Sequence, residues 1–199
     1  MLAEIRNIFS KGRVKYVNDA IVVLDEDFRS NTLWKITASN IDVVNSMMHY
    51  RVPIKNISKY ALYSYYVDYY LAQASNGGFS QFVYNTRWNL NIVNCVRLGL
   101  TEMQASANLD VFERGAALFE KMDYRDVDRF FYGKYYDEDN VVREILDSIN
   151  DGFYNLKNSE SLLEINAHWL RNHKNLRVLN SEDIKTYIYL ALNDGVNKK

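Results

Sequence analysis

The sequence predicts an all-α protein, a single-domain helical bundle of about eight helices. Two observations favour this fold class. The 199 residues include one proline and eight glycines, so few positions oppose a helix. Apolar residues recur at spacings of three and four along most of the chain, which is the pattern of a helix buried along one face. A chain of this length can bury a full hydrophobic core.

The first 40 residues are the least helical part of the sequence. The run Ile21-Val22-Val23-Leu24 is typical of a short strand or a buried extended arm, so we expect the bundle to carry a short strand-like N-terminal arm. We therefore divide the chain into an N-terminal extension packed on the core, residues 1–40, and a helical domain, residues 41–199. Within that domain, Val52-Pro53 separates a short helix at about residues 40–49 from a long helix that begins near residue 59.

The long helix, residues 59–75, carries six tyrosines among leucines and valines, so its apolar surface covers most of its circumference. Such a helix is expected at the centre of the bundle. A row of tyrosines can also stack on nucleic-acid bases, but no lysine or arginine lies between residues 60 and 86 to hold phosphates. We therefore interpret the tyrosines as core residues.

The run Asn76-Gly77-Gly78-Phe79-Ser80-Gln81-Phe82 follows this helix. Paired glycines end a helix, because glycine accepts the left-handed conformation at a helix exit, and Ser80 and Gln81 can open the next helix.

Capping residues predict the helices that follow. The expected set is a helix at 90–98 capped by Asn89 and ended by Gly99, a helix opened by the capping box Thr101 to Gln104 and running through Phe119, a helix at about 140–149, a helix from the capping box at Ser161 to about His173, and a last helix after Ser181.

The amino-acid composition argues against several classes of function. A net charge of −1 gives the whole chain no strong field, so we expect neither direct nucleic-acid binding nor membrane binding. Cys95 is the only cysteine, which excludes an internal disulfide, and we expect it to be a buried small apolar residue. No apolar run is long enough for a membrane span or a signal peptide, so we expect a cytoplasmic protein.

Catalytic and metal-binding patterns are weak. Glu164 and His168 share one helix face, but two ligands do not make a metal site. Ser80 lies in a run that lacks the second glycine of a hydrolase elbow and has no evident histidine partner. The acidic run at 137–140 is followed by Val141 and Val142, where a calcium loop needs an oxygen ligand and glycine. We therefore expect no enzyme activity, no metal and no cofactor.

Charge is distributed unevenly. Residues 120–151 hold ten acids and five bases, a net of −5, whereas residues 1–60 hold six acids and nine bases. The acidic segment is either a solvated face partly paired with its own Arg125 and Arg129, or a surface that binds a protein partner. The candidate partner-binding residues are Asp123, Asp126, Asp128, Asp137, Glu138, Asp139, Glu144 and Asp147.

The segment from Asn76 to Asn85 resembles the motif of the bacterial DNA-mimic protein family. Similarity to that family extends over about residues 60–172, and the first 40 residues are not characteristic of it. We interpret the motif residues mainly as determinants of the fold, and they are Asn76, Gly77, Gly78, Phe79, Gln81, Phe82 and Asn85.

The resemblance implies an all-α, non-catalytic protein-protein interaction module without a cofactor. In the member that gives the family its name, an acidic surface on a dimer imitates DNA and occupies the DNA-binding face of a transcription regulator. The implied partner is thus a basic DNA-binding regulator, and a homodimer is compatible with the resemblance. Against mimicry stand the near-neutral net charge and the bases Lys121, Arg125 and Arg129. The alternative is an immunity-type or structural helical protein with one dedicated partner.

Overall fold

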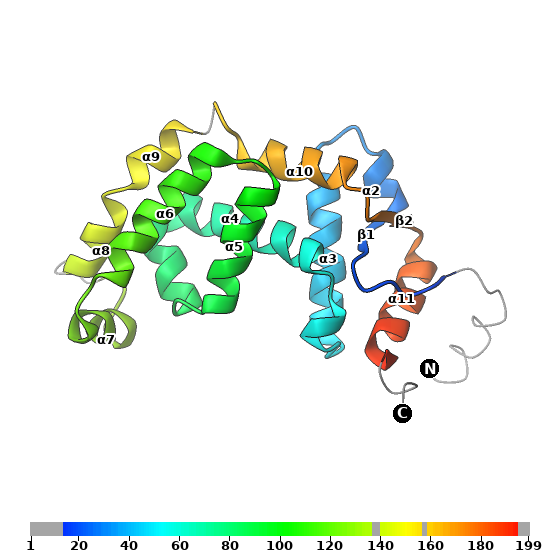
Figure 1. The fold of residues 1–199 in the computed structure, drawn as a ribbon, viewed down its shortest axis with the longest axis horizontal. Coiled ribbons are helices and arrows are strands. Elements are labelled where there is room, and N and C mark those ends of the chain that lie inside the picture. The colour runs from blue at the N-terminus through cyan, green and yellow to red at the C-terminus, as the bar shows by residue number, and fades with distance from the viewer. Residues whose placement is uncertain (1–13, 137–139, 157–158, 195–199) are drawn as a thin grey trace. The chain divides into compact units, whose positions relative to one another are not determined.

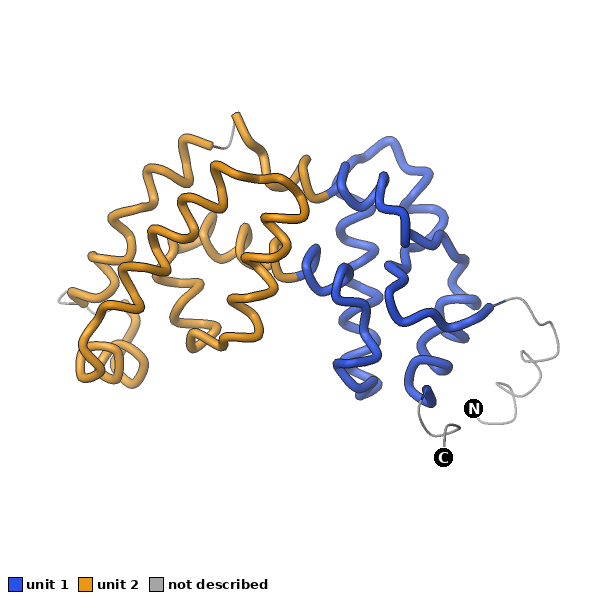
Figure 2. The backbone as a smooth tube through the Cα atoms, in the orientation of Figure 1, with its two compact units in different colours: residues 1–65, 167–199 blue, residues 66–166 orange. Residues whose placement is uncertain are grey.

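The computed structural model describes residues 14–136, 140–156 and 159–194. Within them the predicted all-α class is confirmed, because helices dominate and the sheet has only two short strands (Figure 1). The chain forms two compact units: unit 1 comprises residues 1–65 and 167–199, and unit 2 comprises residues 66–166 (Figure 2). The division of the chain at residue 40 stays a prediction. Among the described helices, none combines the length and the apolar character that a bilayer span requires.

Unit 1 is built around a parallel pair of strands that lie far apart in the sequence. β1 (Ile21–Leu24) pairs with β2 (Leu176–Leu179) in the register Ile21 to Leu176. The expected strand-like arm is therefore a strand, and Ile21 and Val23 are fully buried. Three helices pack on β1, namely α2 (Asp25–Arg29), α3 (Lys35–His49) and α11 (Ser181–Asn193). Sequence patterns did not predict β2 or α2.

A short 3-10 helix, η2 (Ile54–Asn56), links α3 to the long helix α4 in unit 1. Asn56 joins three segments here: its side-chain Nδ2 donates to the carbonyl of Ala191 at 2.8 Å, and its carbonyl accepts from the Tyr16 hydroxyl at 2.8 Å. These bonds tie the segment before β1 and the end of α11 to the same point.

Unit 2 is a helical unit with an aromatic core. It contains most of α4 (Lys59–Thr86), then α5 (Leu90–Glu102), α6 (Ser106–Glu120), α7 (Tyr124–Tyr132), α8 (Val141–Asp147), α9 (Asn150–Asn155) and the first residues of α10 (Leu162–Asn172). Tyr70 of α4 is buried, and its ring lies 5.1 Å from Phe112, 5.4 Å from Phe82 and 5.9 Å from Phe153. Edge-to-face packing of this kind stabilises a core beyond the area that it buries.

Several predicted helix boundaries are wrong, and α3 begins at Lys35 rather than near residue 40. α5 does not end at Gly99 but continues to Glu102, and the capping box at Thr101 does not start α6, which begins at Ser106. The helix stop is Gln104, which adopts a φ of 58°, while the amide of Ala105 donates to the carbonyl of Leu100 at 2.9 Å. This is a Schellman ending with glutamine in the place that glycine usually takes.

Cys95 is half-buried rather than buried. It lies on α5, between the buried Val93 and Val96. The expectation that Cys95 is buried is therefore wrong, because its side chain is partly exposed.

Candidate functional site

α4 is interrupted at its two glycines. Gly77 has φ −148° and ψ 22°, and Gly78 has φ 81° and ψ −176°. Residues with a side chain rarely adopt the second conformation, so the prediction that a glycine conformation breaks this helix is confirmed. The backbone amides after Gly78 are the first amides of a new helical segment. Like those at any helix start, they have no carbonyl of the same helix to accept their hydrogen bonds.

Side chains from α8 and α9 bind these free amides. The Asn150 Oδ1 accepts from the amide of Phe79 at 3.0 Å, and the Asp147 Oδ1 accepts from the amide of Ser80 at 3.1 Å. The Asp147 Oδ2 also accepts from the Ser80 hydroxyl at 2.9 Å. A Cβ atom on Gly78 would lie 2.4 Å from that Asp147 Oδ1, so the glycine also provides the space for this cap.

Tyr135 closes the other side of the break. Its hydroxyl donates to the carbonyl of Gly77 at 2.9 Å and lies 2.8 Å from the Ser80 Oγ. Burial is the main cause that raises the pKa of Tyr135 above its ordinary value. The phenol is therefore held in its protonated form, in which it can donate.

The remaining motif residues join the two halves of α4. Gln73, before the break, accepts at its Oε1 from Gln81 at 2.9 Å and from Asn85 at 2.6 Å, both after the break. Phe79 and Phe82 are buried in the aromatic core, whereas Asn76 is exposed. Apart from Asn76, the motif side chains thus make contacts inside unit 2, which supports a role in the fold.

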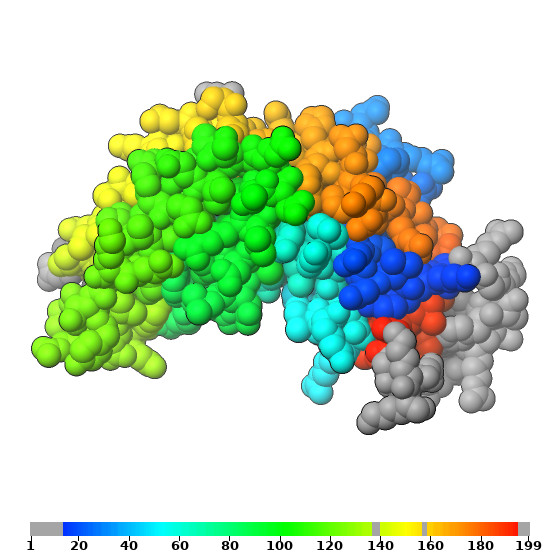
Figure 3. Space-filling view, in the orientation of Figure 1, coloured from blue at the N-terminus to red at the C-terminus, as the bar shows by residue number. Residues whose placement is uncertain are grey.

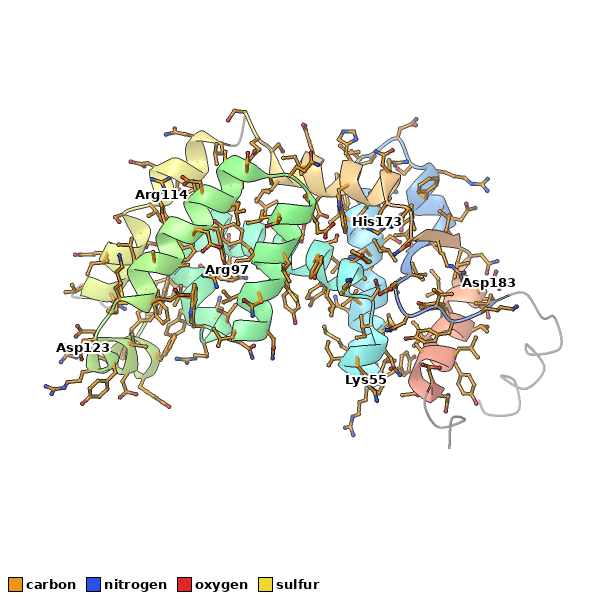
Figure 4. All side chains as sticks on the ribbon, in the orientation of Figure 1. Lys55, Arg97, Arg114, Asp123, His173 and Asp183 are labelled. Carbon is orange, nitrogen blue, oxygen red and sulfur yellow. The ribbon has the colours of Figure 1, made fainter. Side chains whose placement is uncertain are left out.

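Several carboxylates of unit 2 are engaged inside the protein. Glu160 accepts from the amides of Asn108, at 2.6 Å, and Ala107, at 3.2 Å, and so caps the start of α6. Arg97 binds two acids of α6, Glu113 at 2.7 Å and Glu120 at 3.1 Å. Figure 4 labels Arg97 beside α5 and α6, and it labels Asp123 at the start of α7. Carboxylates in such contacts are partly or fully neutralised.

The sequence-predicted acidic residues therefore divide into two groups. Asp147 is half-buried at the α4 break, and Asp123 caps α7 by accepting from the amide of Arg125 at 2.8 Å. Asp126, Asp128 and Glu144 are exposed. Asp137, Glu138 and Asp139 lie outside the described residues.

Asp151 of α9 is a further exposed acid that the candidate set omitted, although it belongs to the acidic segment. We name Asp126, Asp128, Glu144 and Asp151 the outer acids. Within the described part of the chain, no ion pair joins an outer acid to a base. They come from three consecutive helices, α7 to α9, and α7 and α8 lie at one end of unit 2 in the space-filling view (Figure 3).

A family of known proteins matches residues 55–173, which include the α4 break, its caps and the outer acids. The matching family is described as DMP19-like protein, where DMP19 stands for DNA mimic protein 19. The chain belongs to the DMP19-like protein family. The resemblance based on the segment from Asn76 to Asn85 is thereby confirmed. Neither the curated proteins nor the solved structures contain a match to the chain.

The DMP19-like region contains Ser80, the serine of the run that lacks the second glycine of a hydrolase elbow. Ser80 is fully buried, and its hydroxyl is bonded to Asp147 and Tyr135. The ring of Tyr84 lies 5.0 Å from that of Tyr135, and Asn85 donates to Gln73. Ser80 and Tyr135 are thus part of the buried core, whereas Asn85 is exposed.

Glu164 and His168 are exposed on α10. In the described residues, no three histidine, cysteine, aspartate or glutamate side chains are grouped so that they could hold a metal ion.

Proposed function

We propose that the chain is a non-catalytic binding protein whose acidic unit 2 occupies the DNA-binding face of a basic protein, such as a transcription regulator. Membership of the DMP19-like family supports this proposal. The observation that carries the proposal is the charge of the two units. Residues 66–166 hold sixteen acids and nine bases, a net of −7, whereas the rest of the chain holds nine acids and fifteen bases, a net of +6.

The net charge of −1 for the whole chain therefore does not describe the charge of unit 2. A partner that contacts only unit 2 meets the net charge of −7 of this unit at short range, and salt at about 0.1 M screens charges beyond about 10 Å. Lys121, Arg125 and Arg129 reduce that field but do not cancel it. The outer acids are its exposed carriers, since their carboxylates have no ion-pair partner among the described bases.

Carboxylates on helices can substitute for phosphates in a basic groove. A basic groove binds DNA largely through the negative charge of the phosphates, and exposed carboxylates carry charge of the same sign. A groove lined with lysine and arginine can accept either set of charges. Duplex DNA and this protein would then exclude each other from the same partner.

The test is capture of proteins from a fraction that binds a double-stranded DNA column. Immobilised protein should retain a subset of this fraction at about 0.1 M salt, release it at about 1 M salt, and lose it when duplex DNA is added. Neutralising the outer acids, with Asp126→Asn, Asp128→Asn, Glu144→Gln and Asp151→Asn together, should weaken retention by about tenfold or more.

A matched control removes the same number of exposed acids from unit 1. It combines Asp19→Asn, Glu26→Gln, Asp42→Asn and Glu182→Gln, all at exposed positions. Retention should be unchanged in this control. Retention that resists both duplex DNA and the loss of the outer acids would contradict the proposed function.

A further inference from the structure

The outward face of α8 carries apolar side chains where a surface helix normally carries polar ones. Val142 and Leu146 are buried, and they fix which face of the helix points into unit 2. On the other side, Val141 is 61% exposed and Ile145 is 42% exposed, with the exposed Glu144 between them at spacings of three and one. Exposed aliphatic side chains beside one another on a helix are typical of a surface that a partner covers.

Tyr136 is a further exposed apolar side chain, next in sequence to Tyr135, which contacts the start of α8. The carbonyl of Tyr135 accepts from Asn140 and from Arg143, each at 3.4 Å, and these bonds hold Tyr135 beside the first turn of α8. Tyr136, the next residue, is 80% exposed. Tyrosine is enriched at protein interfaces, because its ring buries a large area at a low cost in conformational entropy. We name Tyr136, Val141, Glu144 and Ile145 the α8 patch.

Arg143, the basic residue of α8, is partly exposed and contacts two other residues of unit 2. The guanidinium of Arg143 lies 5.5 Å from the centre of the Tyr135 ring, and its Nε is 3.9 Å from the Asp147 carboxylate. On α7, by contrast, Arg125 and Arg129 are exposed beside the outer acids. The charge that the α8 patch presents is therefore the carboxylate of Glu144.

We propose that the α8 patch is the docking surface for a basic amphipathic helix of the partner protein. This inference rests on the proposed function and adds the chemistry of the segment that is bound. The partner's apolar side chains cover Val141, Ile145 and Tyr136, and its lysines or arginines meet Glu144. A helix that lays its apolar face on an apolar surface and its charges on the rim is a common mode of recognition.

The apolar side chains of the α8 patch provide selectivity between partners, which charge alone cannot provide. Duplex DNA attracts every basic groove, so a purely electrostatic mimic would bind many DNA-binding proteins alike. Apolar contacts at the centre of an interface supply discrimination between partners, because they require a complementary shape.

The test uses two synthetic peptides with equal length and charge. One is a leucine-lysine amphipathic helical peptide, and in the other serine replaces each leucine. The full chain should bind the amphipathic peptide about tenfold more tightly than the serine peptide. The double variant Val141→Glu with Ile145→Glu adds negative charge while it removes the apolar surface. It should lose that tenfold preference.

The control is Leu90→Glu with Leu98→Glu, which changes two α5 residues that are 61% and 48% exposed. It should keep the preference, and circular dichroism should show both variants folded. Equal or tighter binding of the amphipathic peptide by the Val141→Glu, Ile145→Glu variant would overturn the docking surface. So would equal binding of the two peptides, or binding of neither. Displacement of captured proteins by duplex DNA would still support the proposed function in each of these cases, so the two failures are distinguishable.

Discussion

The carboxylates at the α4 break and the outer acids have the same chemistry and differ in their contacts. Asp147 accepts two hydrogen bonds from Ser80, whereas Asp128 is exposed on α7, without an ion pair to any described base. The first holds a helix start in place, and the second is available to a partner. Net charge alone therefore overstates how much acid a surface offers.

The same distinction applies across unit 2. Glu160 caps α6, and Glu113 and Glu120 bind Arg97, so each of these acids contributes less to the outward field than an unpaired acid does. Mutations should accordingly fall into two classes. Changes at the break should lower the free energy of unfolding, and changes to the outer acids should lower binding while stability stays nearly constant.

Substitution at Gly78 should have the largest effect. In Gly78→Ala the new Cβ meets Asp147 and Asn150 side-chain atoms at 2.4 Å and 2.3 Å, and alanine is strained at a φ of 81°. Both costs act at once, so we expect a loss of about 2–5 kcal/mol in the free energy of unfolding, measured with a chemical denaturant.

The control is Ser75→Ala, at an exposed position of α4 before the break. It should change stability by less than about 0.5 kcal/mol. Equal stability of Gly78→Ala and Ser75→Ala would show that the break does not depend on glycine.

The pair Asp147→Ala and Asp128→Ala tests the comparison directly. Removal of the Asp147 carboxylate leaves the amide and the hydroxyl of Ser80 without this acceptor, so we expect a loss of about 2–3 kcal/mol. Asp128→Ala should stay within about 0.5 kcal/mol of the parent protein. Denaturant unfolding of the two variants side by side measures the difference. Similar losses in both would remove the distinction between the two groups of acids.

Local signals predicted the parts of this fold that depend on neighbouring residues. The Gly77-Gly78 break depends on the backbone conformation of the two glycines themselves, and the Asn89 cap of α5 and the start of α11 each rest on a bond that a residue makes within a few positions. Family membership was predicted from the same local string, the segment from Asn76 to Asn85. Residues 176–179 gave no strand signal, because all four are half-buried and their partner β1 lies far away in the sequence.

Other features needed the three-dimensional structure. Gln104 ends α5 in a left-handed conformation that sequence rules assign to glycine, so the end of that helix was misplaced at Gly99. The caps of the α4 break come from residues about seventy positions away, and no local pattern links Asp147 to Ser80. Sequence therefore supplied the number of acids, and only the structure separated those engaged inside unit 2 from those that face solvent.

The pH dependence of stability should show the smallest of the three effects. Burial raises the pKa of Tyr135 above the ordinary value of 10.0, so the folded protein keeps the phenol proton at a pH where the unfolded chain releases it. The resulting stability is complete below about pH 10 and is lost as the pH rises through the raised pKa. Ionisation also removes the donor that Tyr135 offers to the Gly77 carbonyl.

The Tyr135→Phe variant isolates the contribution of Tyr135. Burial also raises the pKa of Tyr70, but Tyr70 is present in the parent protein and in the variant, so its contribution cancels. The free energy of unfolding of the variant should be lower than that of the parent protein near pH 8, and the difference should narrow as the pH rises above about 10. Tyr132→Phe, at a position that is 85% exposed, is the matched control. A constant difference between the parent protein and Tyr135→Phe across this range would mean that the break does not sense the phenol proton. The outer acids would then differ from the break only in their carboxylate contacts, and not in any coupling to a buried titrating group.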